Sequence, residues 1–402
     1  MRADLATQRR SLYQLPSGFR SWQEKRPPHK REKARETALD VFLGQISTSL
    51  RVVTVRRCYV CRGPVGQAHA QYPMLCGDCA VVNLAHRDQR VDLEGYTALV
   101  TGARTKIGYH TAVRLLRNGA TVLATSRFPR SAWAAYAAEP DVGDWAHRLH
   151  LFGLDLLRVD RLDVFVEQVY QTVPALDVLV NNAAQTVVDD GATQRWYAAE
   201  ADLSRRALTQ APASDGPPTP AGLAVMAPTV PGELVVGGSL TLSSNGRNAW
   251  TKHSTQVDVR ELLETQLINV TAPYLLATTL KPLLEASEHP NRFVINVSSL
   301  EGKFSIAKKS PKHPHTNMGK AALNMMTKTL AGEYRKSGIF VYSVDPGWVS
   351  DQFPDDHRAP RRELPLDMVD AAARITHPVF AWRDAESPPT GIFLKDYSPT
   401  SW

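Results

Sequence analysis

The chain has 402 residues, 43% of them hydrophobic, and is therefore long enough to bury a sizeable core. Its formal net charge of +7 is confined to one end, because residues 1–57 hold thirteen Lys/Arg against five Asp/Glu while the remainder holds thirty-four against thirty-five. This distribution excludes a basic surface extending over the whole protein. The absence of any run of eighteen apolar residues excludes a membrane-spanning helix.

Residues 1–57 form a basic arm. Residues 1–30 have the composition of a loop, and residues 32–50 place apolar side chains on one helical face, so the arm is predicted to be partly helical. The arm is either a solvated tail or a contact surface for nucleic acid, an acidic protein or a membrane surface. We favour a tail, and expect no nucleic-acid partner, because aromatic residues are not interleaved with the basic ones beyond Trp22. The first residues lack the apolar core of a secretory signal, and the acidic residues of the arm argue against a transit peptide, so a cytoplasmic location is expected.

The four cysteines of the chain stand in two C-x2-C pairs separated by fourteen residues: Cys58 and Cys61, then Cys76 and Cys79. Two such pairs can supply four thiolates in a tetrahedron around Zn²⁺. Two disulfides or four unrelated thiols are the alternatives, and zinc is favoured because a cytoplasmic compartment keeps thiols reduced. Residues 58–90 are therefore predicted to form a structural zinc module, whose closed four-sulfur site leaves no position for catalysis and whose folding depends on the metal. The first predicted strand follows soon afterwards, so the module is expected to be docked on the larger domain.

Short apolar, β-branched runs alternate with helical patterns from residue 91 onward. This alternation predicts an α/β fold with a doubly wound parallel sheet. The predicted strands span residues 97–101, 121–125, 149–153, 176–181, 292–297, 339–344 and 392–395. The first strand ends in a glycine turn before a helical pattern, a geometry that offers backbone N–H groups and a helix dipole to a pyrophosphate.

Residues 185–257 interrupt this alternation. The segment is too long for a plain connection and is rich in proline, which predicts an insertion that contains a mobile loop. Because it leaves from the carboxyl end of a strand, it could cover the ligand site. An excursion without a function fits the same composition.

Six motifs follow one another along the predicted sheet: TGARTKIG, LDVLVNNAA, LINVTAPYLL, FVINVSS, TNMGKAALN and VDPGWVS. Together and in this order they resemble the short-chain dehydrogenase/reductase family, over about residues 91–397. The resemblance implies a Rossmann-type domain over residues 91–402 and hydride transfer between a nicotinamide cofactor and a small-molecule carbonyl or alcohol. It also implies a homo-oligomer that pairs helices over residues 259–284 and 320–336. The cysteine module and the insertion lie outside the family pattern.

The resemblance assigns the glycine turn to the cofactor phosphates. Gly102 and Gly108 match the first and last glycines of the family motif, and Arg104 and Ile107 belong to the same turn. Lys106 stands at the position of the middle glycine. A lysine there costs closeness of the backbone to the phosphates but offers them a cation.

Ser126 and Arg127 follow the second strand, where a fold that prefers NAD usually has an acidic residue. A hydroxyl and a guanidinium suit a 2′-phosphate, so NADP is favoured over NAD. The resemblance implies further cofactor residues. These are Asp155 beside the adenine, Asn182 and Ala183 of an Asn-Asn-Ala turn in which Ala184 replaces the usual glycine, Lys320 on the nicotinamide ribose, and Pro346 and Gly347 under the nicotinamide.

In the family a tyrosine gives the proton, a serine holds the substrate oxygen, a lysine tunes the tyrosine and an asparagine completes a proton relay. Ser299, Lys320 and Asn269 match three of these residues. The position of the tyrosine, four residues before the lysine, is Thr316. A threonine hydroxyl is a far weaker acid than a phenol, so the usual proton donor is replaced.

His313 and His315 lie just upstream and could take the acid–base role, since histidine titrates near neutrality. The alternative is that both belong to an exposed loop without a role. Residues 351–365, at the position of the family's substrate lid, are charged, which argues against a strongly apolar substrate.

Three functions remain open. The first is an NADP-dependent oxidoreductase with a substituted proton donor, favoured by the three retained active-site matches. The second is a catalytically inactive nucleotide-binding protein used for sensing or assembly, favoured by the missing tyrosine, the replacement at Lys106 and the added modules. The third, a nucleic-acid-binding protein built on the zinc module, rests only on charge and one small domain. The identity of the substrate is not readable from the sequence.

Overall fold

The computed structural model describes residues 56–185, 197–202, 222–224, 249–350 and 363–402. The predicted helix in the basic arm, most of the insertion and most of the predicted substrate lid lie outside these residues. The fold below is that of the unit Arg57–Trp402, the second of the two units into which the chain divides.

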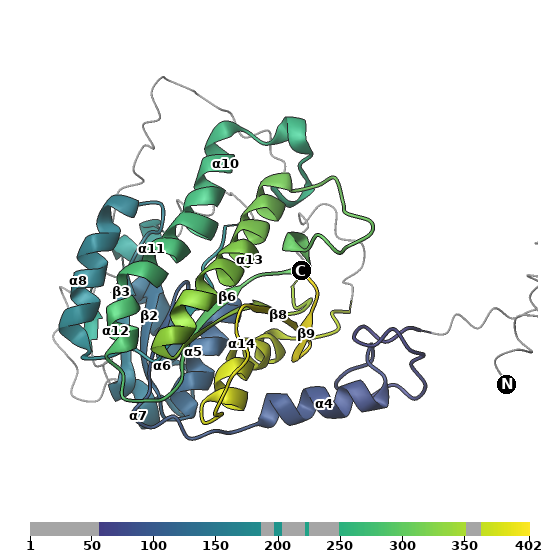
Figure 1. The fold of residues 1–402 in the computed structure, drawn as a ribbon, viewed down its shortest axis with the longest axis horizontal. Coiled ribbons are helices and arrows are strands. Elements are labelled where there is room, and N and C mark those ends of the chain that lie inside the picture. The colour runs from purple at the N-terminus through teal and green to yellow at the C-terminus, as the bar shows by residue number, and fades with distance from the viewer. Residues whose placement is uncertain (1–55, 186–196, 203–221, 225–248, 351–362) are drawn as a thin grey trace, which may run out of the picture. The chain divides into compact units, whose positions relative to one another are not determined.

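A nine-stranded sheet lies at the centre of this unit, in the order β5-β3-β2-β1-β4-β6-β7-β8-β9 (Figure 1). Neighbouring strands are parallel except for β9, which runs antiparallel to β8. The strands are β1 Thr97–Val100, β2 Thr121–Ser126, β3 Leu149–Gly153, β4 Val178–Asn181, β5 Gly222–Ala224, β6 Arg292–Val297, β7 Ile339–Asp345, β8 Ile392–Lys395 and β9 Ser398–Thr400. The central strands are buried on both faces, which explains their continuous apolar sequences.

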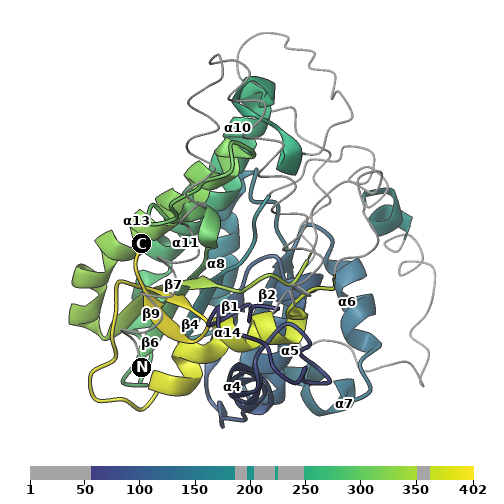
Figure 2. The same cartoon turned by 90° about the vertical axis from the view of Figure 1, so that its right-hand side faces the viewer.

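Helices cover both faces of the sheet (Figures 1 and 2). One layer contains α5 Lys106–Arg117, α6 Pro129–Ala137, α7 Val142–Trp145 and α14 Met368–Trp382. The other contains α8 Leu162–Thr172, α11 Ala272–Thr279, α12 Lys281–Glu285 and α13 Pro314–Tyr334. Short 3₁₀ turns span Ala146–Arg148, Val159–Arg161, Ala249–Thr251, Ser254–Gln256, Leu300–Gly302 and Arg335–Ser337.

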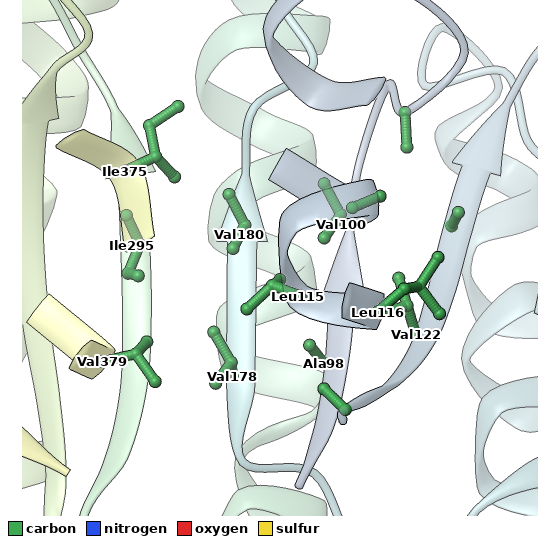
Figure 3. Packing of buried hydrophobic residues seen from close by; sticks show 14 of the residues in the cluster. Ala98, Val100, Leu115, Leu116, Val122, Val178, Val180, Ile295, Ile375 and Val379 are labelled. Atoms are coloured by element: carbon green, nitrogen blue, oxygen red, sulfur yellow. The ribbon is translucent and has the colours of Figure 1, made fainter. Parts of the chain in front are cut away.

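Alternate residues of each strand point to opposite layers. Ala98 and Val100 join the core beneath α5 and α14, whereas Leu99 between them joins the core beneath α11 and α13. Figure 3 shows the first of these cores, in which Leu115 of α5 and Ile375 of α14 lie over the strands. The doubly wound parallel sheet predicted from the sequence is therefore confirmed.

The structure contains two strands that the sequence did not predict, and it divides one predicted helix into several segments. All seven predicted strands are present, but β5, which comes from the insertion, and β9 extend the sheet at its two edges. The helix predicted over residues 259–284 is divided into α10 Val259–Gln266, a π-turn Leu267–Thr271, α11 and α12. Pro273 explains the π-turn, because a proline has no N–H for the carbonyl four residues earlier and its ring would clash with it.

The cysteine module is docked on the sheet domain. Its helix α4 Gly77–Asp88 lies beside α14 (Figure 1). Arg114 of α5, only 6% exposed, donates to the carbonyl oxygens of His86, Arg87 and Gln89 at the end of α4, at 2.7, 2.6 and 3.2 Å. These carbonyls have no partner inside their own helix, so a buried cation serves as their cap. No helix in the described part of the chain combines the length and apolarity needed to cross a bilayer.

Candidate cofactor and active site

The glycine turn after β1 packs directly against the turn after β4. Gly102 has φ +66°, and a Cβ there would stand 2.9 Å from the Cα of Ala183. A Cβ on Gly108 would stand 2.3 Å from the Nδ2 of Asn182 and 2.4 Å from the carbonyl oxygen of Gly102. Both positions therefore require glycine for steric reasons within the protein itself.

Thr101 joins the same two turns by hydrogen bonds, a role that sequence reasoning did not assign to it. Its buried Oγ1 accepts from the backbone N–H groups of Asn182 and Ala183, both at 3.0 Å. The Nδ2 of Asn182 donates in return to the carbonyl oxygen of Thr101 at 2.9 Å. The turns at the carboxyl ends of β1 and β4 are thereby held in one geometry.

Lys106 is the first residue of α5 and has a left-handed backbone conformation, with φ +54°, which glycine adopts most readily. This left-handed conformation costs a non-glycine residue roughly 1 kcal/mol. Its side chain is exposed, and neither a side-chain cap from Thr105 nor an acidic residue occupies the first turn of the helix. The N–H groups of α5 and an exposed cation thus face the same region, a geometry suited to phosphate.

Two arginines and a serine gather at the carboxyl end of β2. The guanidinium groups of Arg104 and Arg127 lie 5.3 and 5.5 Å from the ring centroid of Phe128. Ser126 is buried, and its Oγ accepts from the N–H of Phe128 at 2.9 Å. Burial and then the nearby charge of Arg127 lower the pKa of Arg104, so the two cations share one small region.

The helical residues 197–202 of the insertion pack against this region, next to α6 in Figure 2. The hydroxyl of Tyr197 donates to Asp155 at 3.2 Å. Glu200, 4% exposed, accepts from the backbone N–H groups of Arg130 and Ser131 in the first turn of α6, at 2.7 and 2.9 Å. Sequence reasoning found no acidic residue near β2 because this carboxylate arrives by a contact between segments far apart in the chain.

Lys320 and Thr316 lie one turn apart on α13, and both are buried. The Nζ of Lys320 donates to the carbonyl oxygen of Val297, at the end of β6, at 2.7 Å. Burial lowers the pKa of Lys320 to about 8. The Oγ1 of Thr316 has no hydrogen-bond partner among the described residues.

Asn269 lies in the π-turn and is fully buried. Its side chain is fixed by the backbone of Gln185, whose N–H donates to Oδ1 at 2.8 Å and whose carbonyl accepts from Nδ2 at 3.2 Å. A Cβ on Gly319 would stand 3.4 Å from the Cβ of Asn269, so this glycine lets α13 approach the π-turn closely. Asn269 consequently lies beside the helix that carries Lys320.

Ser299 precedes the turn Leu300–Gly302, which packs on α13 at the level of Lys320. A Cβ on Gly302 would stand 2.6 Å from the carbonyl carbon of Lys320. Asn324, one helical turn further, donates to the carbonyl oxygen of Gly302 at 3.0 Å and accepts from the hydroxyl of Ser298 at 2.7 Å. The predicted serine, lysine, asparagine and threonine are therefore gathered around the first half of α13. Asn324 anchors the turn after β6 to α13, a role that sequence reasoning missed. Its position four residues after Lys320, on the same face of the helix, could have indicated it.

His313 and His315 are buried, so the interpretation that they belong to an exposed loop is wrong. The Nδ1 of His313 lies 2.8 Å from the carbonyl oxygen of Trp250, and its ring stacks on the indole. His315 faces α10, with Nε2 3.6 Å from the Oε1 of Glu261. Burial lowers the pKa of both histidines, that of His315 to about 4, so neither holds a proton to donate as a cation at neutral pH.

Pro346 and Gly347 follow β7. Gly347 has φ +88°, and a Cβ there would stand 2.5 Å from Cδ1 of Leu366. Its N–H donates to Oδ1 of Asp345 at 2.7 Å. The turn therefore also depends on glycine for its shape.

The four cysteine sulfurs, from Cys58, Cys61, Cys76 and Cys79, all lie within 4.8 Å of one another, and none forms a disulfide. Sγ of Cys61 and Sγ of Cys76 are 3.6 Å apart, close to the ~3.8 Å edge of a tetrahedral Zn–S₄ site. Although burial raises the pKa of Cys58, backbone N–H groups directed at its sulfur lower it to about 7, whereas burial raises the pKa of Cys79 and the pKa of Cys61 is also raised, so without metal the thiolate is favoured at Cys58 over these two.

Two family models match the chain: the short chain dehydrogenase model over residues 96–202 and the enoyl-(acyl carrier protein) reductase model over residues 242–364. Residues 96–202 thus match the short-chain dehydrogenase family, and the fold is that of solved short-chain dehydrogenases. It is 30% identical over 348 residues to the uncharacterized protein R665 of Acanthamoeba polyphaga mimivirus, covering 83% of this chain and 73% of that protein. It is 32% identical over 98 residues to the short chain dehydrogenase pgmD of Aspergillus terreus, covering 24% of this chain and 31% of that protein.

Among solved structures, the carbonyl reductase Sniffer of D. melanogaster matches with a TM-score of 0.50 at 20% identity, covering 77% of this chain and 100% of that one. A short-chain dehydrogenase from Burkholderia cenocepacia in complex with NADP matches with a TM-score of 0.50 at 19% identity, covering 75% and 96%. At these identities the two structures show the shared fold.

Proposed function

We propose that the protein is an NADP-dependent oxidoreductase that transfers a hydride between the nicotinamide and a carbonyl or hydroxyl group of a small molecule. The observation that carries this proposal is the gathering of Asn269, Ser299, Thr316 and the buried Lys320 around α13, at the same edge of the sheet as the glycine turn. The carboxyl edge of a parallel sheet is where such folds bind their ligands.

The donor groups at this edge fit a dinucleotide. The uncapped first turn of α5 and Lys106 would receive the diphosphate, and Arg104, Ser126 and Arg127 the 2′-phosphate of the adenosine end. The complex of the B. cenocepacia neighbour with NADP supports this choice of cofactor. The remaining cofactor contacts we propose are those of Gly102, Ile107, Gly108, Asp155, Asn182, Ala183, Lys320, Pro346 and Gly347.

When bound, the nicotinamide supplies or accepts the hydride, and the protein must hold the substrate oxygen and move a proton to it. Ser299 donates a hydrogen bond to that oxygen. Lys320 is the acid: its pKa of about 8 leaves it protonated at pH 7 yet far more acidic than an ordinary lysine. Thr316, one turn away with an unpartnered hydroxyl, would pass the proton from Lys320 to the oxygen, and Asn269, held by the backbone of Gln185, is the fourth residue of the proposed site.

A second function is favoured by Thr316 itself. A hydroxyl without a base strong enough to ionise it suits a catalytically inactive dinucleotide-binding protein. This alternative predicts binding of the cofactor without turnover of any carbonyl or alcohol.

The four-cysteine module holds one structural Zn²⁺ in this proposal. The support is the mutual proximity of the four sulfurs and the small size of the module's core. A closed S₄ site gives the metal no substrate position, so its contribution is to folding.

We also propose that the protein self-associates through the helices beside the site. Val259, Tyr274, Met318 and Met325, on α10, α11 and α13, are between 49% and 61% exposed. Large apolar side chains that remain exposed on adjoining helices are typical of a buried interface between subunits.

A titration with NADPH and NADH, followed by nicotinamide fluorescence, tests the proposed function. In wild-type protein we expect NADPH to bind more tightly than NADH, and Arg127→Ala to weaken NADPH selectively. Arg383→Ala is the control, because Arg383 pairs with Asp384 at the end of α14. Equal weakening of both nucleotides by Arg127→Ala contradicts the role in 2′-phosphate binding, and binding of neither nucleotide contradicts the function. Binding without turnover in a carbonyl screen favours the inactive alternative.

A further inference from the structure

Tyr59, between the first two cysteines, contacts the turn proposed to lie under the nicotinamide. Its hydroxyl oxygen accepts from the backbone N–H of Trp348, the residue after Gly347, at 2.9 Å. The Nζ of Lys395, at the end of β8, lies 5.1 Å from the centroid of the same ring. One side chain of the cysteine module therefore fixes the backbone that follows the Pro346–Gly347 turn.

The apolar core of the module includes residues from both cofactor turns. Val349, after the Pro-Gly turn, is 4% exposed, and Ile107 of the glycine turn is partly buried against the same cluster. The module contributes buried side chains to this cluster from Cys58, Tyr72, Leu75 and Ala80, and the start of α14 contributes Leu366 and Ala371. Neither the module nor the loop after β7 buries its apolar side chains without the other.

A buried carboxylate at the start of α14 anchors the module in the same place. Oδ1 of Asp370, a fully buried residue, accepts from the hydroxyl of Tyr72 at 2.7 Å, from Nδ2 of Asn83 at 2.9 Å and from Arg87 at 2.9 Å. Loss of these donors would leave a buried charge without its partners, at a cost of several kcal/mol. These hydrogen bonds fix the position of the module on α14, in addition to the apolar contacts of the shared core.

We infer that the four-cysteine module is a metal-dependent support for the cofactor site. With the metal bound, Tyr59 and the shared core hold the loop 346–349 in the shape that binds the nicotinamide end. This inference rests on the proposed function for both ligands, the zinc and the dinucleotide. Because each ligand favours the same arrangement of the loop, binding of one must raise the affinity for the other.

The physical link is the position of Tyr59 inside the first C-x2-C turn. The backbone of that turn is constrained by its two sulfur ligands, and the module's core is too small to fix it without metal. Release of the metal frees the Tyr59 hydroxyl from the Trp348 N–H. The Pro346–Gly347 turn is then still held by the hydrogen bond from the N–H of Gly347 to Oδ1 of Asp345.

Hydrogen exchange of the full chain, resolved on peptides covering residues 346–350, tests the inference. It is measured with zinc bound, after chelation, after zinc is restored, and in Tyr59→Phe, which keeps the ring and all four cysteines. We expect chelation and Tyr59→Phe to increase exchange in these peptides, and zinc to reverse the effect of chelation. We also expect Tyr59→Phe to bind one zinc, as wild type does, and to weaken NADPH about threefold to tenfold, the size expected for one lost hydrogen bond. Tyr170→Phe is the control, since the hydroxyl of Tyr170 bonds the carbonyl of Thr279 in the opposite helix layer.

Each outcome decides the inference. Unchanged exchange over residues 346–350 after chelation and in Tyr59→Phe overturns it, as does a wild-type protein that binds no zinc. If neither nucleotide binds the zinc-loaded protein, the proposed function fails, but the exchange measurement still decides whether the module supports the loop.

Discussion

Lys320 is the residue at which burial and charge conflict most directly. Its side chain is 6% exposed, and the hydrogen bond to the carbonyl of Val297 is its one named contact. The charge is retained near neutrality although burial disfavours it, because pH 7 lies below the lowered pKa of about 8. Strongly shifted pKa values cluster at functional sites, which accords with the proton-donor role proposed for this lysine.

Replacement of this lysine should therefore change how stability depends on pH. The pKa of Lys320 is about 8 in the folded protein, against 10.5 for an unperturbed lysine. Between these values the unfolded chain binds more protons, so wild-type stability should rise with pH across the window from 8 to 10.5. Lys320→Met removes that rise, which amounts to at most roughly 3 kcal/mol. Denaturant unfolding at pH 7, 8.5 and 10 measures it, and parallel curves for the two proteins would contradict the shifted pKa.

Thr316 should show opposite effects on stability and activity. Thr316→Val keeps the shape of the side chain and removes a buried hydroxyl that has no partner among the described residues. We expect the free energy of unfolding to rise by about 1 kcal/mol and turnover of a carbonyl substrate to fall at least tenfold, with NADPH binding unchanged. Thr278→Val on α11, whose hydroxyl bonds only carbonyls of its own helix, is the matched control. Unchanged turnover in Thr316→Val would remove Thr316 from the proton path.

At the scale of elements, the contact between the turn after β6 and α13 sets the position of Ser299. Gly302→Ala would place a methyl group 2.6 Å from the backbone of Lys320. We expect a loss of about 1–3 kcal/mol in stability from this overpacking, together with loss of turnover as Ser299 moves. Gly332 lies on α13, and a methyl group there would have no described atom within 4 Å. Gly332→Ala should therefore stabilise the protein by about 0.5–1 kcal/mol. Thermal unfolding of both variants measures these two changes in stability. A Gly302→Ala protein as stable as wild type would contradict the close contact between the turn and α13.

The helical residues 197–202 bring an acidic group to the adenosine end of the proposed site. The carboxylate of Glu200 accepts from the first N–H groups of α6, and its charge is felt at Arg104. Since a carboxylate repels a 2′-phosphate, Glu200→Gln should tighten NADPH binding more than NADH binding, about threefold to tenfold. Fluorescence titration measures the ratio of the two dissociation constants, with Glu167→Gln on the exposed face of α8 as the control. A ratio unchanged in Glu200→Gln would place the 2′-phosphate away from this carboxylate.

The elements that sequence reasoning predicted are those whose signal is local. Val178 and Val180 belong to an apolar, β-branched run that is buried on both faces, so β4 could be predicted from composition alone. A side chain at Gly102 or Gly108 would collide with backbone or with Asn182. Because the structure requires glycine at both positions, the turn could be located in the sequence. The π-turn was missed although Pro273 signals it.

The contributions that were missed depend on contacts between distant segments. β5 is three residues long and is defined by its pairing with β3, and Glu200 reaches α6 from the insertion. The burial of His313 was missed for the same reason, since Trp250, which covers it, lies more than sixty residues earlier in the chain. No period or spacing in the sequence carries such information.

At the scale of the whole second unit, the cysteine module and the sheet domain satisfy each other's buried charges. Arg114 extends from α5 to the end of α4, and Asp370 of α14 receives donors from the module. Burial lowers the pKa of Arg114 to about 10, which measures how far its charge is removed from water. The module is thus a structural part of the unit, in addition to its proposed effect on the cofactor loop.

This mutual dependence predicts that zinc removal destabilises the sheet domain as well as the module. Without a folded module, water would replace the lost partners of Arg114 and Asp370, and the apolar side chains that the domain buries against the module, among them Val349 and Leu366, would be exposed, a change that costs roughly 2 kcal/mol or more. Calorimetry of the full chain should therefore show the main transition lowered by about 3 °C after chelation, as roughly 2 kcal/mol implies for a unit of this size. Cys61→Ser should reproduce the shift because Cys61 is exposed and its replacement disturbs little besides the metal site. A small separate transition, with the main midpoint unchanged in both samples, would mean that the sheet domain is stable without the module, and the contacts of Arg114 and Asp370 would then contribute to docking alone.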